Sequence, residues 1–250
     1  MLPTDEAGTV GLLDGTGDEL VIVEQAGDRA MVTLNDAVTR DASSQPLAAS
    51  LHQTLRQLVA VAELRAIVLT GVEDAFSSGV DGPETAAGWP EGSPRASNGA
   101  VRSQLGEVAR LIAHSDVPFI AAVNGVAAGA GLALALTCDV VILSDQARLA
   151  PGAGRVGLLS EVGMSWLLTR QLGYDRTVSL FRPGYELTAA QALRAGLVDA
   201  VVERDELAFA ISFWCEISAL AATRGISKRL VRSAADSSQG RATVMGEFAA

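Results

Sequence analysis

Hydrophobic and polar positions change their spacing several times along the chain. Short apolar runs at residues 21–23 and 30–34 flank the turn-forming sequence Ala26-Gly27-Asp28, which predicts a β-hairpin. From Pro46 onward, apolar residues recur every three or four positions, at Leu47, Leu51, Leu55, Leu58 and Ala62. This spacing predicts an amphipathic helix, which leads into an apolar strand over residues 66–70.

The same order of elements returns further along the chain. A helix predicted around residues 101–113 precedes Pro118 and an apolar strand at 119–123, and a short helix at 132–137 precedes a strand at 140–143. Strands that are unbroken apolar runs are typical of parallel sheets buried on both faces. We therefore expect an α/β fold of stacked ββα turns, interrupted by a mobile loop over residues 88–98.

The two ends of the chain differ from this middle part. Residues 1–18 mix Gly, Thr, Asp and Glu without periodicity, which predicts a flexible leader. Residues 19–202 are expected to form the core, and residues 203–250 a helical region. A basic group lies near its end, at Arg224, Lys228, Arg229 and Arg232.

Composition narrows the possible partners. The formal net charge of -10 disfavours nucleic acid and anionic membrane surfaces, because a like-charged surface repels phosphates. No apolar run is long enough for a membrane span and no targeting segment is visible, so a cytoplasmic protein is expected. Cys138 and Cys215 lack metal-ligand spacing and are expected to be small buried side chains; no metal site is predicted.

Two glycine-rich segments follow predicted strands. They are Phe76-Ser77-Ser78-Gly79-Val80-Asp81 and the run from Asn124-Gly125 through Gly129-Ala130-Gly131. The first N–H groups of a helix have no intrahelical partner and attract negative charge. If both segments face one cavity, the N–H groups of Ser78 and Ala130 form an oxyanion hole, in which each donor contributes about 3 to 4 kcal/mol in the transition state.

Glycine-rich turns also occur in other kinds of site. A single glycine-rich turn of this kind more often reflects tight packing than catalysis. The spacing of Gly125, Gly129 and Gly131 fits neither the dinucleotide fingerprint nor the P-loop. Ser78 does not lie in a G-x-S-x-G elbow, which argues against an α/β-hydrolase nucleophile.

From Val68 to Val202 the chain resembles the crotonase superfamily, the enoyl-CoA hydratase/isomerase family. Both glycine-rich segments resemble the two oxyanion-hole motifs of that family, and Cys138-Asp139 follows the second as expected. Residues 187–193 with Gly196-Leu197-Val198 resemble a helix and turn late in the family's core, and Arg40-Asp41-Ala42 resembles its opening motif.

The resemblance implies a fold and a ligand. It implies a ββα spiral, a homotrimer or homohexamer with C-terminal helices completing the interface, and a role in fatty acid metabolism. The ligand is a coenzyme A thioester, which acts as substrate rather than as a separate cofactor. Ser78 and Ala130 are expected to bind its carbonyl oxygen, while Lys228 and Arg40 are expected near the coenzyme A. Lys228 is also compatible with a solvated basic helix end.

The chain departs from the hydratase pattern at two positions. Where hydratases of the family carry glutamates, this chain has Ala133 and Ala153, so the usual water addition loses a 10²- to 10⁴-fold contribution. Glu161 lies where isomerases of the family carry an acid, and is the predicted base for one-base double-bond isomerisation. A helix-capping or surface carboxylate is the alternative for Glu161.

The remaining titratable candidates are assigned structural roles. Asp81 and Asp139 are expected to stabilise turns, and His52 and His114 to be exposed and not catalytic. Three functional hypotheses remain: an enolate-forming isomerase, a catalytically silent acyl-CoA-binding protein, and a hydratase with a non-standard base.

Overall fold

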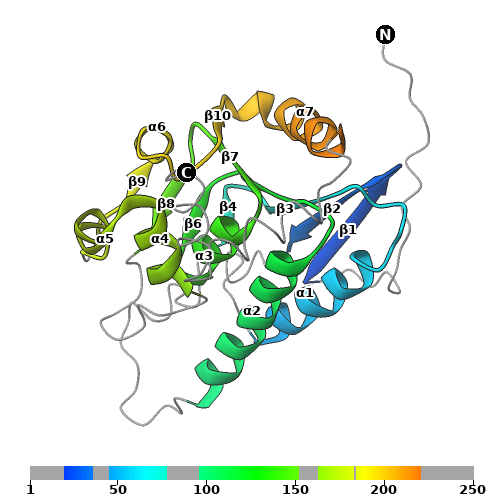
Figure 1. Ribbon diagram of the computed structural model, residues 1–250, viewed down its shortest axis with the longest axis horizontal. Coiled ribbons are helices and arrows are strands. Elements are labelled where there is room, and N and C mark those ends of the chain that lie inside the picture. The colour runs from blue at the N-terminus through cyan, green and yellow to red at the C-terminus, as the bar shows by residue number, and fades with distance from the viewer. Residues whose placement is uncertain (1–19, 36–44, 78–95, 152–162, 183, 221–250) are drawn as a thin grey trace, which may run out of the picture.

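The computed structural model describes residues 20–35, 45–77, 96–151, 163–182 and 184–220 (Figure 1). Within these ranges the chain is an α/β fold with a six-stranded sheet and a four-stranded sheet. The expected α/β class is therefore confirmed. The elements fall into repeated strand-strand-helix units, which explains why apolar runs and amphipathic stretches alternate in the sequence.

The six-stranded sheet has the order β1-β2-β3-β5-β7-β10. The predicted hairpin is confirmed, and its first strand continues to Ala26, so that Gly27 (φ 61°) and Asp28 alone make the turn. The other neighbours are parallel. The strands are β1 (Val21–Ala26), β2 (Arg29–Leu34), β3 (Ala66–Gly71), β5 (Phe119–Val123), β7 (Val140–Ser144) and β10 (Ala200–Val202).

The four-stranded sheet has the order β4-β6-β8-β9 and was not predicted. Its strands are two or three residues long, too short to show an alternating pattern. They are β4 (Ala75–Ser77), β6 (Val126–Ala128), β8 (Arg148–Ala150) and β9 (Leu187–Thr188). β4, β6 and β8 each follow a strand of the large sheet, which completes the expected ββα turns.

Three predicted helices are present, but their ends differ from the prediction. The helices are α1 (Gln45–Leu58), α2 (Ala96–His114), α3 (Gly129–Thr137), α4 (Met164–Leu172), α5 (Tyr174–Leu180), α6 (Ala189–Arg194) and α7 (Leu207–Leu220), with the 3₁₀ turn η3 (Arg204–Glu206). Three predicted boundaries were wrong. α1 ends at Leu58 and leaves Ala62 exposed, α2 begins at Ala96 so that residues 96–98 are helical rather than loop, and α3 begins three residues early. Residues 88–95 of the predicted loop lie outside the described ranges.

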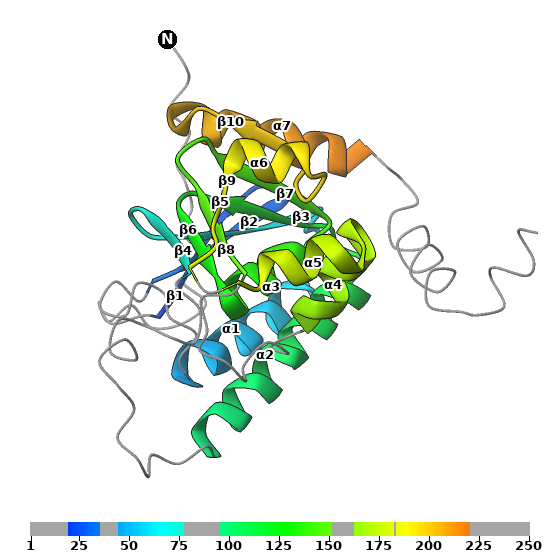
Figure 2. The ribbon, with the colours of Figure 1, turned by 90° about the vertical axis from the view of Figure 1, so that its left-hand side faces the viewer.

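Helices cover both faces of the large sheet. α1 and α2 lie on one side and α7 on the other (Figure 2). On β5, Phe119, Ala121 and Val123 face the core shared with α1, α2 and α3, while Ile120 and Ala122 pack with residues of α7. This two-sided burial explains the unbroken apolar letters of β5. Cys138 and Cys215 are buried thiols, as predicted.

The parallel register brings the turns that follow β3 and β5 together. β3 and β5 are neighbours, with Ile67 opposite Phe119 and Leu69 opposite Ala121. Their carboxyl ends therefore open at the same edge of the sheet. The turn from β3 to β4 and the turn from β5 to β6 lie next to each other at that edge.

Candidate active site

Ala130 lies at the start of α3. The residue before it, Gly129, has a left-handed backbone (φ 46°), and Ala128 is extended (φ -127°, ψ 151°) with no side-chain capping bond. The backbone thus turns sharply from β6 into the helix, which only glycine does without strain. The N–H of Ala130 belongs to the first turn, where amides have no intrahelical acceptor and the helix dipole is positive.

β4 ends against this first turn. β4 pairs with β6 in parallel, with Ser77 opposite Ala127. A Cβ on Gly131 would overlap the Cβ and Oγ of Ser77 and lie 3.1 Å from its carbonyl oxygen, so the end of β4 packs directly against the backbone of Gly131. Ser78 is the next residue of the chain and lies outside the described ranges. The segments that carry the two predicted oxyanion donors are therefore adjacent.

Asn124 fixes the turn that leads into β4, a role that was not predicted. Its side-chain nitrogen donates to the carbonyl oxygens of Gly71 (3.0 Å), Ala75 (3.1 Å) and Glu73 (3.2 Å). Its side-chain oxygen accepts from the N–H of Gly71 (3.2 Å). An Asn-Gly pair directly after a buried strand was visible in the sequence, but its partners were not.

Two glycines allow this close approach. A Cβ on Gly71 would lie 2.6 Å from the carbonyl oxygen of Phe76, and a Cβ on Gly125 would lie 2.8 Å from the nitrogen of Ala75 and overlap the carbonyl of Asp74. A side chain at Gly71 would disrupt the turn into β4, and a side chain at Gly125 would push the two turns apart.

The surroundings of Ala130 are apolar. Its side chain is fully buried in a small cluster with Ala48 of α1 and Leu105 of α2. Ala133, one turn further along α3, is 0% exposed and belongs to the main hydrophobic core. The carbonyl of Ala133 accepts a hydrogen bond from Thr137 Oγ1 (2.8 Å). Ala133 therefore presents only a methyl group, which is packed on all sides.

Several predicted residues lie outside the described ranges: Arg40, Asp81, Ala153, Glu161 and Lys228, in addition to Ser78. Their roles stay predictions.

The structure describes the remaining predicted residues, Asp139, His52 and His114. Asp139 Oδ2 accepts from the N–H of Phe119 (2.8 Å), which confirms a structural role at the start of β5. Asp199 makes the same kind of bond to the N–H of Val141 (2.7 Å). His114 is exposed and contacts the carbonyl of Arg110 (2.8 Å), while His52 on α1 is half-buried rather than exposed.

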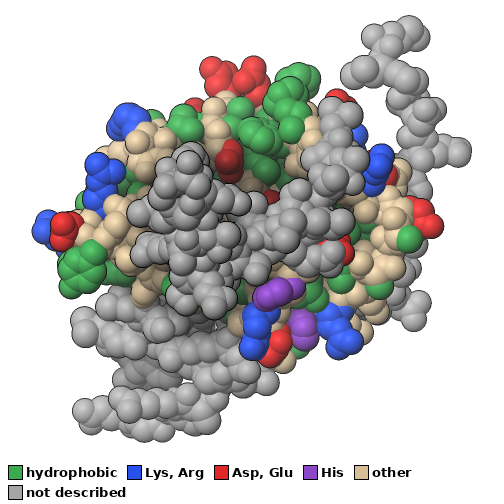
Figure 3. Space-filling view, in the orientation of Figure 1, with side chains coloured by type: hydrophobic (Ala, Val, Ile, Leu, Met, Phe, Trp, Pro, Cys, Tyr) green, Lys and Arg blue, Asp and Glu red, His purple; other side chains and the backbone are tan. Residues whose placement is uncertain are grey.

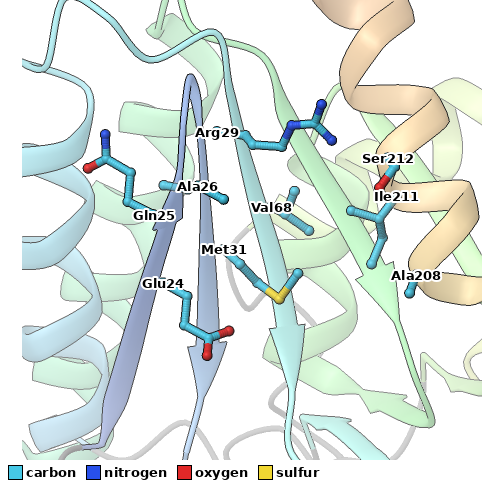
Figure 4. Close-up of a pocket in the computed structure, with 10 residues that line it drawn as sticks. Glu24, Gln25, Ala26, Arg29, Met31, Val68, Ala208, Ile211 and Ser212 are labelled. Carbon is cyan, nitrogen blue, oxygen red and sulfur yellow. The ribbon is translucent and has the colours of Figure 1, made fainter. Parts of the chain in front are cut away.

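A separate cavity lies on the far face of the large sheet. It measures about 380 Å³ and lies between the β1–β2 hairpin and α7, with Met31, Val68 and Ile211 among its lining residues (Figure 4). Val68 and Ile211 pack with the α7 core, whereas Ala130 packs on the α1 and α2 side. This cavity is therefore not part of the site around Ala130.

Within the described part of the chain, no group of three or more His, Cys, Asp or Glu side chains is placed to hold a metal ion. None of the helices found there has both the length and the apolar content that crossing a membrane requires.

Comparison with known proteins assigns the family. Residues 25–242 match the family Enoyl-CoA hydratase/isomerase. The chain is 34% identical over 189 residues to a probable enoyl-CoA hydratase of Rhizobium meliloti, covering 76% of this chain and 71% of that protein. It is 33% identical over 177 residues to 1,2-epoxyphenylacetyl-CoA isomerase of Escherichia coli, covering 71% and 67%.

A solved structure agrees with this match. The crystal structure of a probable enoyl-CoA hydratase/isomerase from Mycobacterium abscessus superposes with a TM-score of 0.79 at 29% identity, covering 92% of this chain and 88% of that chain. The fold, the packing of β4 against the start of α3 and these matches agree with the resemblance seen in the sequence. The chain belongs to the enoyl-CoA hydratase/isomerase family of the crotonase superfamily.

Proposed function

We propose that this protein binds an acyl-CoA thioester and stabilises its enolate, and that it acts as a double-bond isomerase rather than as a hydratase. The observation that carries the proposal is the contact between Ser77 and Gly131, which brings the end of β4 against the first turn of α3. The amides of Ser78 and Ala130 would then donate to one thioester oxygen.

The chemistry needs one base. Glu161 removes a proton from Cα of a β,γ-unsaturated acyl-CoA, and the electron pair moves onto the thioester oxygen, where the two amides stabilise the negative charge. The same carboxyl returns the proton to Cγ, so the double bond moves from Cβ=Cγ to Cα=Cβ. Burial of a carboxyl in an apolar site such as the one around Ala130 disfavours its charged form and suits it to proton transfer near neutral pH.

The packing of Ala133 supports isomerisation over hydration. A hydratase positions a water with acids, and here the first of these positions is a buried methyl group in the core. One of the relatives carries the name of an isomerase, 1,2-epoxyphenylacetyl-CoA isomerase. Two alternatives remain: a catalytically silent acyl-CoA-binding protein, and a hydratase whose base is not among the usual two glutamates.

The partners follow from the same proposal. Lys228 and Arg40 would contact the coenzyme A, and no further cofactor is required. The protein would assemble as a homotrimer or homohexamer. α7 supports assembly because Phe209, Phe213 and Ile217 form a stripe on it with exposed fractions of 76%, 50% and 42%. Hydrophobic side chains gather over α7 in Figure 3, and such patches mark protein interfaces.

The decisive experiment follows the Cα proton. The protein is incubated in D₂O with a β,γ-unsaturated acyl-CoA, and deuterium incorporation and double-bond position are read by NMR. We expect exchange and isomerisation in the wild type and loss of both in Glu161→Gln, with thioester binding kept. The exposed Glu63→Gln on the α1–β3 connection is the matched control and should behave as wild type.

Each alternative has its own outcome in this experiment. Binding without exchange in the wild type identifies the silent acyl-CoA-binding protein. An absorbance assay with crotonyl-CoA tests hydration. Rapid loss of the conjugated double bond in that assay identifies a hydratase and contradicts the conclusion drawn from Ala133.

A further inference from the structure

We propose that Asn124 and Arg204 are positioning residues that hold β4 in place against the first turn of α3. The turn of residues 71–75 joins β3 to β4 and determines where β4 begins. This inference rests on the proposed function for its catalytic consequence. The geometry it uses lies entirely within described residues.

Every carbonyl of this turn has a defined partner. Those of Gly71, Glu73 and Ala75 accept from the Asn124 side chain. The carbonyl of Val72 accepts from the N–H of Ala75 (3.2 Å), and that of Asp74 accepts from the N–H of Val126 (3.2 Å). Apart from the local Val72 bond, these partners are Asn124 and Val126, which belong to the β5–β6 segment. That segment continues directly into Ala130.

Arg204 adds a partner from a distant part of the chain. Its Nη2 donates to the carbonyl oxygen of Glu73 (2.9 Å), across 131 residues of sequence. Glu73 is the non-glycine residue with a left-handed backbone (φ 53°) among the described residues. Such a conformation persists only where its surroundings fix it, and the Glu73 carbonyl receives donors from both Asn124 and Arg204.

The consequence is preorganisation of the oxyanion hole. The turn before β4 is tied to the segment before Ala130, so the end of β4 keeps its position against α3 before any thioester binds. Catalytic donors work best when they need no rearrangement at the moment of reaction. In this proposal Asn124 and Arg204 act through the position of β4, so their loss should affect enolate formation more than thioester binding.

The test uses acetoacetyl-CoA, a thioester whose enolate absorbs in the near ultraviolet. Asn124→Asp keeps the shape of the side chain but replaces the donor nitrogen with an oxygen facing three carbonyls. We expect this variant to lower the enolate signal by about 100-fold, and kcat for isomerisation of a β,γ-unsaturated acyl-CoA by a similar factor, as for a small misplacement of catalytic groups. The Kd for coenzyme A should change less than threefold.

Two substitutions of different severity test the role of Arg204. Arg204→Ala should lower kcat roughly threefold, because the lost hydrogen bond is exposed, and Arg204→Lys should restore part of the loss. Gln57→Glu on α1 and Arg182→Ala after α5 are exposed controls for the same changes of chemistry and should leave kcat and the enolate signal unchanged.

A second readout keeps the inference separate from the proposed function. Hydrogen exchange at Ala75, Phe76 and Ser77 reports how firmly β4 is held, whatever the protein catalyses. If the wild type forms no enolate, the proposed function fails. Faster exchange in Asn124→Asp and Arg204→Ala would still support the positioning role. Unchanged exchange in both variants, or an unchanged enolate signal in an active protein, overturns it.

Discussion

The backbone of Gly131 packs against the side chain of Ser77, because the hydrogen of Gly131 occupies the space where any other residue would place a carbon. Ser77 is 1% exposed and ends β4, and Gly131 follows the residue that supplies the predicted α3 amide. The spacing of the candidate oxyanion hole therefore depends on the absence of one methyl group.

Gly131→Ala should separate β4 from α3. The added Cβ overlaps Ser77, so one of the two backbones must move. We expect a loss of about 1 to 3 kcal/mol in the free energy of unfolding and a fall in kcat of roughly 100-fold or more. Urea unfolding and enolate absorbance measure the two effects. Gly106→Ala on α2, where an added Cβ meets nothing within 4 Å, should instead stabilise the protein by about 0.5 to 1 kcal/mol.

Glu73 should tolerate glycine better than a β-branched residue. Its left-handed backbone (φ 53°) suits glycine and is an outlier for valine. We expect Glu73→Gly to change the free energy of unfolding by less than about 1 kcal/mol, and Glu73→Val to cost about 1 to 3 kcal/mol. Equal stabilities of the two variants in urea would contradict the assigned backbone conformation.

Asp139 should matter for folding and not for chemistry. Its carboxylate accepts from the N–H of Phe119 at the start of β5. Asp139→Ala should lower the free energy of unfolding by about 1 to 3 kcal/mol, and Asp139→Asn by less because an oxygen acceptor remains. A kcat that falls in the folded Asp139→Asn variant would show that the residue does more than stabilise the turn.

Cys215 links stability to alkaline pH. Burial raises the pKa of its thiol, while Arg29 acts in the opposite direction and Asp28 and Glu216 add to the rise. The folded state therefore keeps the proton at a pH where the unfolded chain releases it. The free energy of unfolding should fall as pH increases above about 8.5.

A variant isolates this contribution. In Cys215→Ala the part of the alkaline decline due to the thiol should disappear, which unfolding series at pH 7 and pH 10 can measure. Mass spectrometry should also find slow alkylation of Cys215 in the folded protein, since the thiolate is the reactive form. Fast alkylation at neutral pH would contradict a buried thiol.

The long elements were predictable and the short ones were not. β5 and α1 appear in the sequence as an apolar run and a helical repeat, because burial dictates those patterns directly. β4 and β6 were missed because strands of three residues leave no alternation, and their geometry depends on pairing with each other. The early start of α3 was missed because it depends on the left-handed turn at Gly129, which its letter permits but does not require.

In the candidate site too, features set by local sequence were predictable and features set by distant partners were not. The glycine-rich turns predicted an oxyanion hole because their residue types limit what the backbone can do. The roles of Asn124 and Arg204 come from partners 49 to 131 residues away in the chain, and no local pattern specifies such partners.

A single substitution at position 130 can remove the backbone N–H that the account assigns to the oxyanion hole. Ala130 follows a left-handed glycine at the beginning of α3, and proline is tolerated in the first turn because its missing N–H has no helical partner. Ala130→Pro therefore deletes the donor, whereas Ala130→Gly keeps it.

The most direct measurement is the infrared stretch of a thioester carbonyl labelled with carbon-13 and bound to these variants. In the wild type and Ala130→Gly, hydrogen bonding should shift the stretch to lower frequency than in solution. In Ala130→Pro the shift should shrink while coenzyme A binding persists. A carbonyl stretch in the wild-type complex equal to that of the free thioester would contradict an oxyanion hole at Ala130.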